Sequence, residues 1–378
     1  MSEKTINKVP NVPNLRFFND NSTWSNSTLE KMCKFVGGGT PSTMNQDYWN
    51  GDIAWISSAD LLEENVHKYN VSRFITEDAV MNSATKICPI NTIMIVSRVG
   101  VGKIAISNSK ICTSQDFINL TEYQFDKDFL VYSLKNTIEK LKISSQGTSI
   151  KGITSKEIKL INIFYPEIIE QHKIGLFFKK IDERISLQNK IIKEYKSYRN
   201  RILHTIYNNL NDYEYLSLNQ VCNITTGKLD ANAMNPNGKY KFFTCAKEDY
   251  YIDTYSFDGE SLIISGNGEV GLIKYFVGKF DAYQRTYVLQ NFTKNPLYIK
   301  VALEIELPKK LHREKNVGAM PYIVLSTLSD IKIKIPNKEL VSNIALIVTS
   351  LDKKIAIEEQ ILNDYLSQKK HLLANMFI

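Results

Sequence analysis

The chain has 378 residues and is 43% hydrophobic, a length and composition typical of two or three folded domains and not of a disordered chain. No apolar run approaches the ~20 residues that span a bilayer, and the N-terminal MSEKTINKVP has no apolar signal core. We therefore expect a cytoplasmic protein without a membrane partner, whose formal charge of +7 permits a polyanionic ligand without requiring one.

Cysteines and histidines give no sign of a disulfide framework or a metal site. The five cysteines are odd in number and form no C-x-x-C pair, and the five histidines form no H-E-x-x-H pattern. We expect the cysteines to be reduced and mostly buried; they are Cys33, Cys88, Cys112, Cys222 and Cys245.

The first clear pair of elements is a hairpin in IMIVSRVGVGKIAI, at 93–106, where a glycine-rich turn joins two apolar runs. Glycine supplies the positive φ angles that such turns need. Its GVGK tetrad is not a phosphate-binding loop, because Ser97 stands where that motif requires glycine and Ile104 where it requires serine or threonine.

A long helix is predicted from about 167 to 210, on the order of 65 Å at 1.5 Å per residue. Apolar residues from Ile174 to Ile206 recur at alternating steps of four and three, the heptad spacing of a coiled-coil seam.

A second hairpin is predicted where SGNGEVGLIKY, at 265–275, carries the spacing G-x-G-x-x-G. A dinucleotide-binding turn requires a helix after the glycines. Here LIKYFV follows and ends at Gly278, which favours a strand. A nucleotide-dependent enzyme that uses Gly266 to Gly271 remains an alternative, which a nucleotide-binding assay would test.

The second long helix, at 337–378, repeats the seam of the first with an offset of 170. Even the polar interruptions coincide, Gln188 with Glu358 and Arg199 with Lys369. The positions that we expect to join the two helices are Ile181, Ile185, Gln188, Ile192, Tyr195, Arg199, Leu351, Ile355, Glu358, Leu362, Tyr365 and Lys369.

The chain is therefore two copies of one unit, because Gln115 also falls on Gln284 with an offset of 169. The predicted fold class is α+β: two β-rich mixed globules separated by two long antiparallel coiled-coil helices, in a pseudo-twofold internal repeat. The expected domains are a globule at 1–166, a spacer helix at 167–210, a globule at 211–336 and a spacer helix at 337–378.

A register follows if the two helices lie antiparallel about the pseudo-twofold axis. Arg199 then faces Glu358, and Gln188 faces Lys369. The alternative is that each helix packs on another part of the fold, as a bundle helix does.

The sequence resembles the specificity subunit of type I restriction-modification systems along its whole length. The resemblance rests on VPNLRF at 12–17, Trp24, GGGTPSTMNQDYWNGDIAWISSADL at 37–61, SRVGVGK, and the helical IEQHKIGLFFKKIDERI. The second copy departs from this pattern: TGKLD at 226–230 stands opposite GGTPS at 38–42, and we find no counterpart of YWNGD.

This resemblance implies two target-recognition domains that read a bipartite, asymmetric site on double-stranded DNA. It implies two methyltransferase subunits docked on the helices, and restriction/translocase subunits. Catalysis and the cofactors S-adenosylmethionine, ATP and Mg would belong to those partners, with none in this chain. Consistent with that, the sequence contains no N/D-P-P-Y/F tetrad and no P-D…E-x-K pattern.

Candidate DNA contacts are forked, amide and basic side chains near the two hairpins, because arginine reads guanine, amides read adenine, and lysine, serine and threonine mostly bind phosphates. They are Arg98, Lys103, Gln115, Thr148, Ser149, Lys151, Asn267, Gln284, Arg285 and Arg313. Arg313 is expected in a basic loop with Lys309, Lys310 and Lys315. Trp49 and Trp55 are expected to pack in the core of the first globule, with stacking on bases as the alternative.

Apolar residues off the seam widen the apolar surface of both helices: Phe177, Leu187, Ile191, Tyr198, Ile347, Ile357 and Ile361. We expect them to contact the methyltransferase subunits, and the alternative is contact with the chain's own globules. A purely structural coiled-coil protein that does not bind DNA is a third hypothesis, which a salt-dependent DNA shift would exclude.

Overall fold

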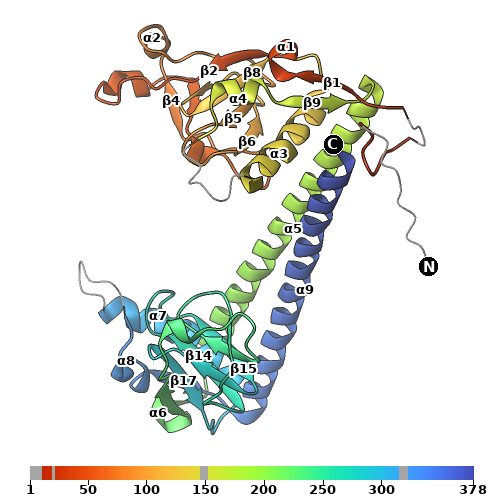
Figure 1. Cartoon of the computed structure of the whole chain (residues 1–378). Helices are drawn as coiled ribbons and strands as arrows, with labels where there is room; N and C mark the ends of the chain where they lie inside the picture. The colour runs from red at the N-terminus through yellow and green to blue at the C-terminus, as the bar shows by residue number, and fades with distance from the viewer. Residues whose placement is uncertain (1–10, 19–21, 145–151, 315–321) are drawn as a thin grey trace, which may run out of the picture. The chain divides into compact units, whose positions relative to one another are not determined.

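The computed structural model describes residues 11–18, 22–144, 152–314 and 322–378. The chain divides into two compact units (Figure 1): unit 1 is Met1–Asn189 with Ile361–Ile378, and unit 2 is Lys190–Gln360. Each unit is thus a globule with a segment of each long helix. No helix among the described residues is long and apolar enough to cross a membrane.

Unit 1 is built on two small sheets and one strand pair. The four-stranded sheet has the order β2 (Lys34–Gly37), β8 (Phe117–Thr121), β5 (Ile93–Val96), β6 (Ile104–Ile106). The three-stranded sheet has the order β4 (Arg73–Ile75), β3 (Ile53–Ile56), β7 (Cys112–Thr113). The strand pair joins β1 (Ser25–Thr28) to β9 (Asn162–Tyr165).

Unit 2 repeats this topology element by element. Its sheets have the orders β11 (Asn223–Thr226), β17 (Thr286–Gln290), β14 (Glu260–Ser265), β15 (Ile273–Val277), and β13 (Tyr250–Ile252), β12 (Tyr240–Phe243), β16 (Phe280–Ala282). The strand pair joins β10 (Glu214–Ser217) to β18 (Lys332–Ile335). The predicted internal repeat and the α+β class are confirmed.

One helix covers the large sheet in each unit, α3 (Lys127–Ser144) in unit 1 and α7 (Pro296–Glu314) in unit 2. The two begin alike, because the side-chain oxygen of Asp126 accepts from Phe129 N at 3.0 Å and that of Asn295 accepts from Leu297 N at 2.9 Å. The short helices are α1 (Leu29–Met32), α2 (Glu77–Met81), α4 (Ser155–Lys159), α6 (Leu218–Val221), α8 (Leu325–Ser329), η1 (Gln46–Trp49), η2 (Ser58–Asp60) and η3 (Ala231–Ala233).

The glycine turns are β-hairpins in both units. Gly102 has φ 84° and Gly271 has φ 80°, and their N–H groups donate to Val96 O and Ser265 O, each at 2.9 Å. Strand β15 follows Gly271 and pairs antiparallel with β14. Since no helix begins at these glycines, the G-x-G-x-x-G spacing is not a dinucleotide-binding turn.

The long helices are α5 (Ile168–Asn208) and α9 (Lys338–Met376), close to the predicted limits. All twelve predicted seam residues are buried or half-buried. The helices are antiparallel: in unit 1, Phe178 packs on Phe377 with 5.6 Å between ring centroids and Asp182 pairs with Lys369. In unit 2, Lys196 pairs with Glu359 at 2.6 Å. The domain limits at 166, 210 and 336 remain a prediction.

The predicted register is wrong in its partners. The Arg199 guanidinium binds Asp352 and Glu304 instead of facing Glu358, and the Lys369 ammonium binds Asp182 instead of facing Gln188. Lys369 gains a carboxylate in place of the Gln188 amide, which is a weaker acceptor for a cation, and Arg199 gains two carboxylates in place of the one at Glu358. Asp182 and Asp352 are themselves related by the offset of 170, so the pseudo-twofold relation holds with these partners in place of the predicted ones.

The two copies also correspond more closely than the sequence indicated. Gly38 N donates to Phe117 O at 3.4 Å and Gly227 N donates to Thr286 O at 3.1 Å, which makes Gly227 the counterpart of Gly38 and shifts the expected alignment by one residue. Strand β12 is preceded by an Asn-Gly pair in NGKYKFF at 237–243, and β3 is preceded by the same pair in NGDIAWI at 50–56. The second copy therefore does have a counterpart of the Asn-Gly turn, although not of the preceding Tyr-Trp.

Candidate nucleic-acid interface

The tip of the first hairpin and the turn between β7 and β8 meet in unit 1. Ser97 N and Ser97 Oγ both donate to Asp116 O, at 2.8 and 2.9 Å, and Ile153 N donates to Ser97 O at 2.8 Å. Arg98 and Gln115 are both exposed beside these bonds. The structure therefore brings together two of the predicted DNA contacts. Thr148, Ser149 and Lys151 lie outside the described residues.

Unit 2 assembles the equivalent surface with the same hydrogen bonds. Gly266 N donates to Arg285 O at 3.0 Å, and Ile323 N donates to Gly266 O at 2.8 Å. Asn267 is half-buried, whereas Gln284 and Arg285 are exposed. Arg98, Gln115 and Asp116 thus correspond to Asn267, Gln284 and Arg285 with the offset of 169. We call each such surface, formed by the hairpin tip and the adjacent turn, a tip surface.

The two tip surfaces have the same backbone and different side chains. The first surface carries an arginine, an amide and a carboxylate, and the second carries two amides and an arginine. Because forked and amide side chains discriminate base edges by hydrogen-bond pattern, the two surfaces are suited to different base sequences.

The expected basic loop is wrong in part, because its residues are helical. Lys309, Lys310 and Arg313 lie within α7, which continues through Pro308. The buried apolar face of α7, including Ile305 and Leu307, outweighs the hydrogen bond that proline removes. Lys309 pairs with Glu306 at 2.9 Å and Lys310 with Glu314 at 3.0 Å. Lys315 lies outside the described residues.

Arg313 remains exposed on the last turn of α7. The same helix reaches the second hairpin, because Leu307 and Leu311 pack against Gly271. Lys103, by contrast, is turned toward its own unit: its ammonium donates to Ser58 O at 3.5 Å and to Leu61 O at 3.3 Å.

Trp55 packs in the core of unit 1 as expected, and its Nε1 donates to Gly39 O at 2.9 Å. A Cβ at Gly38 would lie 1.9 Å from Ser114 O and one at Gly39 would lie 2.4 Å from Ala84 C, which explains these two glycines; a Cβ at Gly37 would meet nothing within 4 Å. Sequence reasoning missed Arg73, which covers the Trp55 ring at 4.4 Å and binds Asp60 at 2.8 Å. Burial raises the pKa of Asp60, but hydrogen bonds from Ser57 and Arg73 lower it by more, so Asp60 stays ionised.

The described residues contain no candidate metal cluster, and the four cysteines whose pKa burial raises are not reactive thiols. No group of three or more His, Cys, Asp or Glu side chains is placed to hold a metal across these ranges. All five cysteines are free, and four are buried. Burial raises the pKa of Cys33, Cys112 and Cys222 to about 12 and that of Cys88 to about 11, so these thiols stay protonated near neutral pH.

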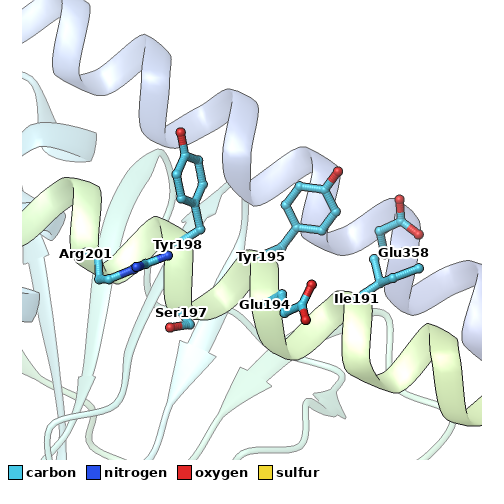
Figure 2. A pocket seen from close by; sticks show the side chains of 7 residues that line it. All are labelled: Ile191, Glu194, Tyr195, Ser197, Tyr198, Arg201 and Glu358. Atoms are coloured by element: carbon cyan, nitrogen blue, oxygen red, sulfur yellow. The ribbon is translucent and has the colours of Figure 1, made fainter.

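The helix surface in unit 2 carries a cavity of about 570 Å³ lined by Ile191, Glu194, Tyr195, Ser197, Tyr198, Arg201 and Glu358. Figure 2 shows the rings of Tyr195 and Tyr198 projecting from α5, with Glu358 contributed by α9. Tyr198 is 49% exposed, and Leu187, Ile191, Ile347 and Ile357 are also exposed. Phe177 differs, because its ring packs edge-on against Phe17 at 5.4 Å within unit 1.

Relatives of known family share long stretches of this sequence. The specificity subunit of the type I restriction enzyme EcoDI of Escherichia coli is 34% identical over 145 residues, which cover 38% of this chain and 32% of that protein. The specificity subunit of the enzyme MjaIX of Methanocaldococcus jannaschii is 31% identical over 182 residues, which cover 45% of this chain and 41% of that protein. The matched stretch spans less than half the length of either relative.

Solved structures share the fold. The S subunit of a type I restriction-modification system from M. genitalium has a TM-score of 0.63 at 18% identity, and the match covers 97% of this chain and 99% of that chain. A chain from a structure on complex assembly of the type I R-M system has a TM-score of 0.56 at 14% identity, and the match covers 93% and 96% of the two chains.

The family described as "Type I restriction modification DNA specificity domain" matches residues 21–197 and again 211–364. These two stretches each begin just before the first strand of a unit and extend into a long helix. The chain therefore belongs to the type I restriction-modification DNA specificity family and contains its domain twice.

Proposed function

We propose that this chain is the subunit that gives a type I restriction-modification complex its DNA sequence specificity. Unit 1 would read one half of a bipartite, asymmetric site on double-stranded DNA, and unit 2 would read the other half. The observation that carries the proposal is the pair of tip surfaces, which repeat the same backbone hydrogen bonds around different side chains.

The chemistry of the tip surfaces supports distinct half-sites. A guanidinium such as that of Arg98 can donate two hydrogen bonds to guanine O6 and N7, and the amide of Asn267 can bind adenine N6 and N7. Thr148, Ser149 and Lys151 would add phosphate contacts in the first half, and Arg313 would do so in the second. Lys103, whose ammonium is occupied by two loop carbonyls, would contribute mainly by holding the first tip surface in place.

The partners in this proposal are two methyltransferase subunits and restriction/translocase subunits. Exposed apolar side chains on the helix segments of unit 2, Ile191 and Tyr198 of α5 and Ile347 and Ile357 of α9, offer the methyltransferases a surface typical of protein interfaces. The cavity beside Tyr195 and Tyr198 gives such a partner a place to insert a side chain.

No catalysis is assigned to this chain. Methyl transfer with S-adenosylmethionine, and cleavage driven by ATP with Mg, belong to the partner subunits in this proposal. This chain would select the DNA sequence, and the partner subunits would catalyse the reactions on it.

The test is to co-express the chain with its methyltransferase subunit in a methylation-free host and to map N6-methyladenine across the genome. We expect a single split, asymmetric motif that disappears when the chain is omitted. A matched control exchanges unit 2's Asn267 and Gln284 for alanine, which should relax only one half of the motif. Methylation that is identical without the chain would refute the proposal.

A further inference from the structure

Unit 2 has an open groove beside the edge of its four-stranded sheet. The groove has a volume of about 530 Å³ and lies between β15, α7 and α9. It is lined by Phe243, Asp249, Ile273, Lys274, Tyr275, Phe276, Leu297, Lys300, Thr349, Asp352, Lys353 and Ala356. None of these residues belongs to a tip surface.

Unit 1 fills the equivalent place with its own chain, in the connection 57–72 between β3 and β4. Val66 is fully buried, and its carbonyl accepts from Ile106 N at 2.8 Å on the edge of β6. The His67 ring lies 5.8 Å from that of Tyr132 and 3.8 Å from the Asp128 carboxylate. The Lys68 ammonium hydrogen-bonds Ser186 of α5. This segment therefore crosses from the sheet edge over α3 to the long helix.

The groove of unit 2 is lined by the counterparts of the residues that hold this segment. With offsets of 169 in the globule and 170 in the helices, Ile106 corresponds to Tyr275 and Asp128 to Leu297. Asp182 corresponds to Asp352, and Ser186 to Ala356. The framework that binds a chain segment in unit 1 is thus present in unit 2 without one.

The groove is open because the connection at 244–249 in unit 2 is too short to fill it. Lys274 holds this short connection against the sheet, donating to Lys247 O at 2.9 Å and to Asp249 Oδ1 at 3.0 Å. Asp249 in turn binds Lys241 at 3.2 Å. The short connection is therefore fixed in its own place and leaves the outer edge of β15 uncovered.

The edge of β15 presents backbone groups to the groove. Ser265 N donates to Leu272 O and Gly278 N donates to Gly259 O, so the hydrogen-bonded pairs of this hairpin fall at 272, 274, 276 and 278. The N–H and C=O of Tyr275 therefore point away from β14, as those of Ile106 do in unit 1. Val277 beside them is 58% exposed. An edge of this kind accepts a further strand.

We propose that an extended segment of a partner protein binds along β15 in this groove. Its backbone carbonyl would accept from Tyr275 N, as Val66 O accepts from Ile106 N in unit 1. Binding of this type adds a strand to an exposed sheet edge, with affinity from the backbone and selectivity from alternate side chains.

The lining specifies the side chains of that segment. Leu297 stands where unit 1 has Asp128, the carboxylate beside His67, so the position equivalent to His67 must be apolar. Lys68 binds Ser186 in unit 1, and the counterpart of Ser186 is Ala356. Lys353 lines the groove one helical turn before Ala356, so an acidic side chain at the position equivalent to Lys68 would meet its ammonium. The expected order is apolar, apolar, acidic. The segment at 61–69 of a second copy does not meet this requirement, and its Val66 is already buried against β6 of its own unit.

The proposal does not depend on DNA recognition, because the groove and the tip surfaces share no residues. A failure of either therefore leaves the other standing.

The test uses the full chain and a fluorescein-labelled peptide with the sequence of residues 61–69 carrying His67→Leu and Lys68→Glu. Fluorescence anisotropy should show saturable binding. Tyr275→Pro removes the outward N–H and should weaken binding by roughly tenfold. Lys353→Glu should weaken it by roughly fivefold and should strengthen binding of a peptide that carries His67→Leu alone. Lys193→Glu, an exposed helix position outside the groove, is the control and should change nothing.

Absence of saturable binding, or binding that ignores both groove substitutions, would overturn the proposal. If Tyr275→Pro fails to fold, as judged by circular dichroism, the charge exchange at Lys353 decides the outcome. Sedimentation of the wild-type chain as a dimer that Lys353→Glu dissociates would assign the groove to a second copy instead, and would equally overturn it.

Discussion

The two units bury the same kind of ion pair to different depths. In unit 1, Lys369 pairs with Asp182, and their side chains are 6% and 2% exposed. In unit 2, the equivalent Arg199 pairs with Asp352, and their side chains are 10% and 36% exposed. The fold and the positions in the helices are the same, so the difference comes from what covers each pair.

Cover in unit 1 comes from the long connection and from α3. The Glu64 carbonyl accepts from Lys369 at 3.0 Å, and Tyr132 Oη donates to Asp182 at 2.7 Å. In unit 2, side chains do this work: Glu304 binds Arg199 at 2.9 Å and Lys300 binds Asp352 at 3.1 Å. The length of the connection between the first two strands of the small sheet therefore decides the second partner of the cation. Lys369 has a backbone carbonyl as its second partner in unit 1, and Arg199 has a second carboxylate in unit 2.

The largest effect is expected from Asp182→Asn. It leaves the Lys369 ammonium buried without a carboxylate, which costs about 3 kcal/mol of unfolding free energy. Urea denaturation followed by circular dichroism would measure the loss. Asp352→Asn is the matched comparison and should cost only about 1 kcal/mol, because Arg199 keeps Glu304 and the site is partly solvated. Equal losses in the two variants would contradict the difference in depth.

A comparable or smaller effect is expected from Arg98→Ala on DNA binding. If Arg98 reads a base, its loss should cost about 1–3 kcal/mol on the preferred site and little on random DNA. Asn267→Ala should act on the other half of the site only. Titrations of the methyltransferase complex with DNA altered in one half at a time would separate the two. An equal loss on cognate and random DNA would remove Arg98 from the base contacts.

The smallest expected effect is a pH dependence of the contribution that Asp352, in unit 2, makes to the unfolding free energy. Burial raises the pKa of Asp352, but hydrogen bonds from Arg199 and the charge of Lys300 lower it by more, so it lies below the ordinary value of 3.8. A lowered pKa in the folded state means that the ionised carboxylate stabilises the fold above that ordinary value and loses this contribution as the pH falls through the folded pKa.

The difference in unfolding free energy between wild type and Asp352→Asn should therefore be constant above about pH 5 and should close below about pH 3.8. Urea titrations at constant ionic strength, from about pH 5 down to well below pH 3.8, would show it. A difference that persists at the acid end would mean that the aspartate acts through packing and not through its charge.

The sequence alone predicted the long helices and the two hairpins, because these depend only on the spacing of apolar residues and on the positions of glycines. The four-and-three spacing gave the buried face of α5 and α9, since 3.6 residues per turn places those side chains on one side. The hairpins followed from the glycines, whose positive φ at Gly102 and Gly271 few other residues adopt.

The failures share a different cause, because they depend on contacts between segments far apart in the chain. The helix register is set by Asp182 and Asp352 together with α3 and α7, which no periodicity within one helix reveals. The basic residues from Lys309 to Arg313 suggested a loop, yet tertiary burial keeps α7 helical through Pro308 to Glu314. Arg73 and its contact with Trp55 could have been suspected only from the structure, because the two residues meet across paired strands.

The strand pairs that open and close each unit have a consequence for how such chains diversify. Ser25 pairs with Tyr165 in unit 1, and Glu214 pairs with Ile335 in unit 2, so in each unit the chain enters and leaves at neighbouring points. The sequence between those points therefore forms a globule whose two ends lie side by side. A recombination event that exchanged one such globule for another of the same kind would deliver a new tip surface and leave the heptads of α5 and α9 untouched.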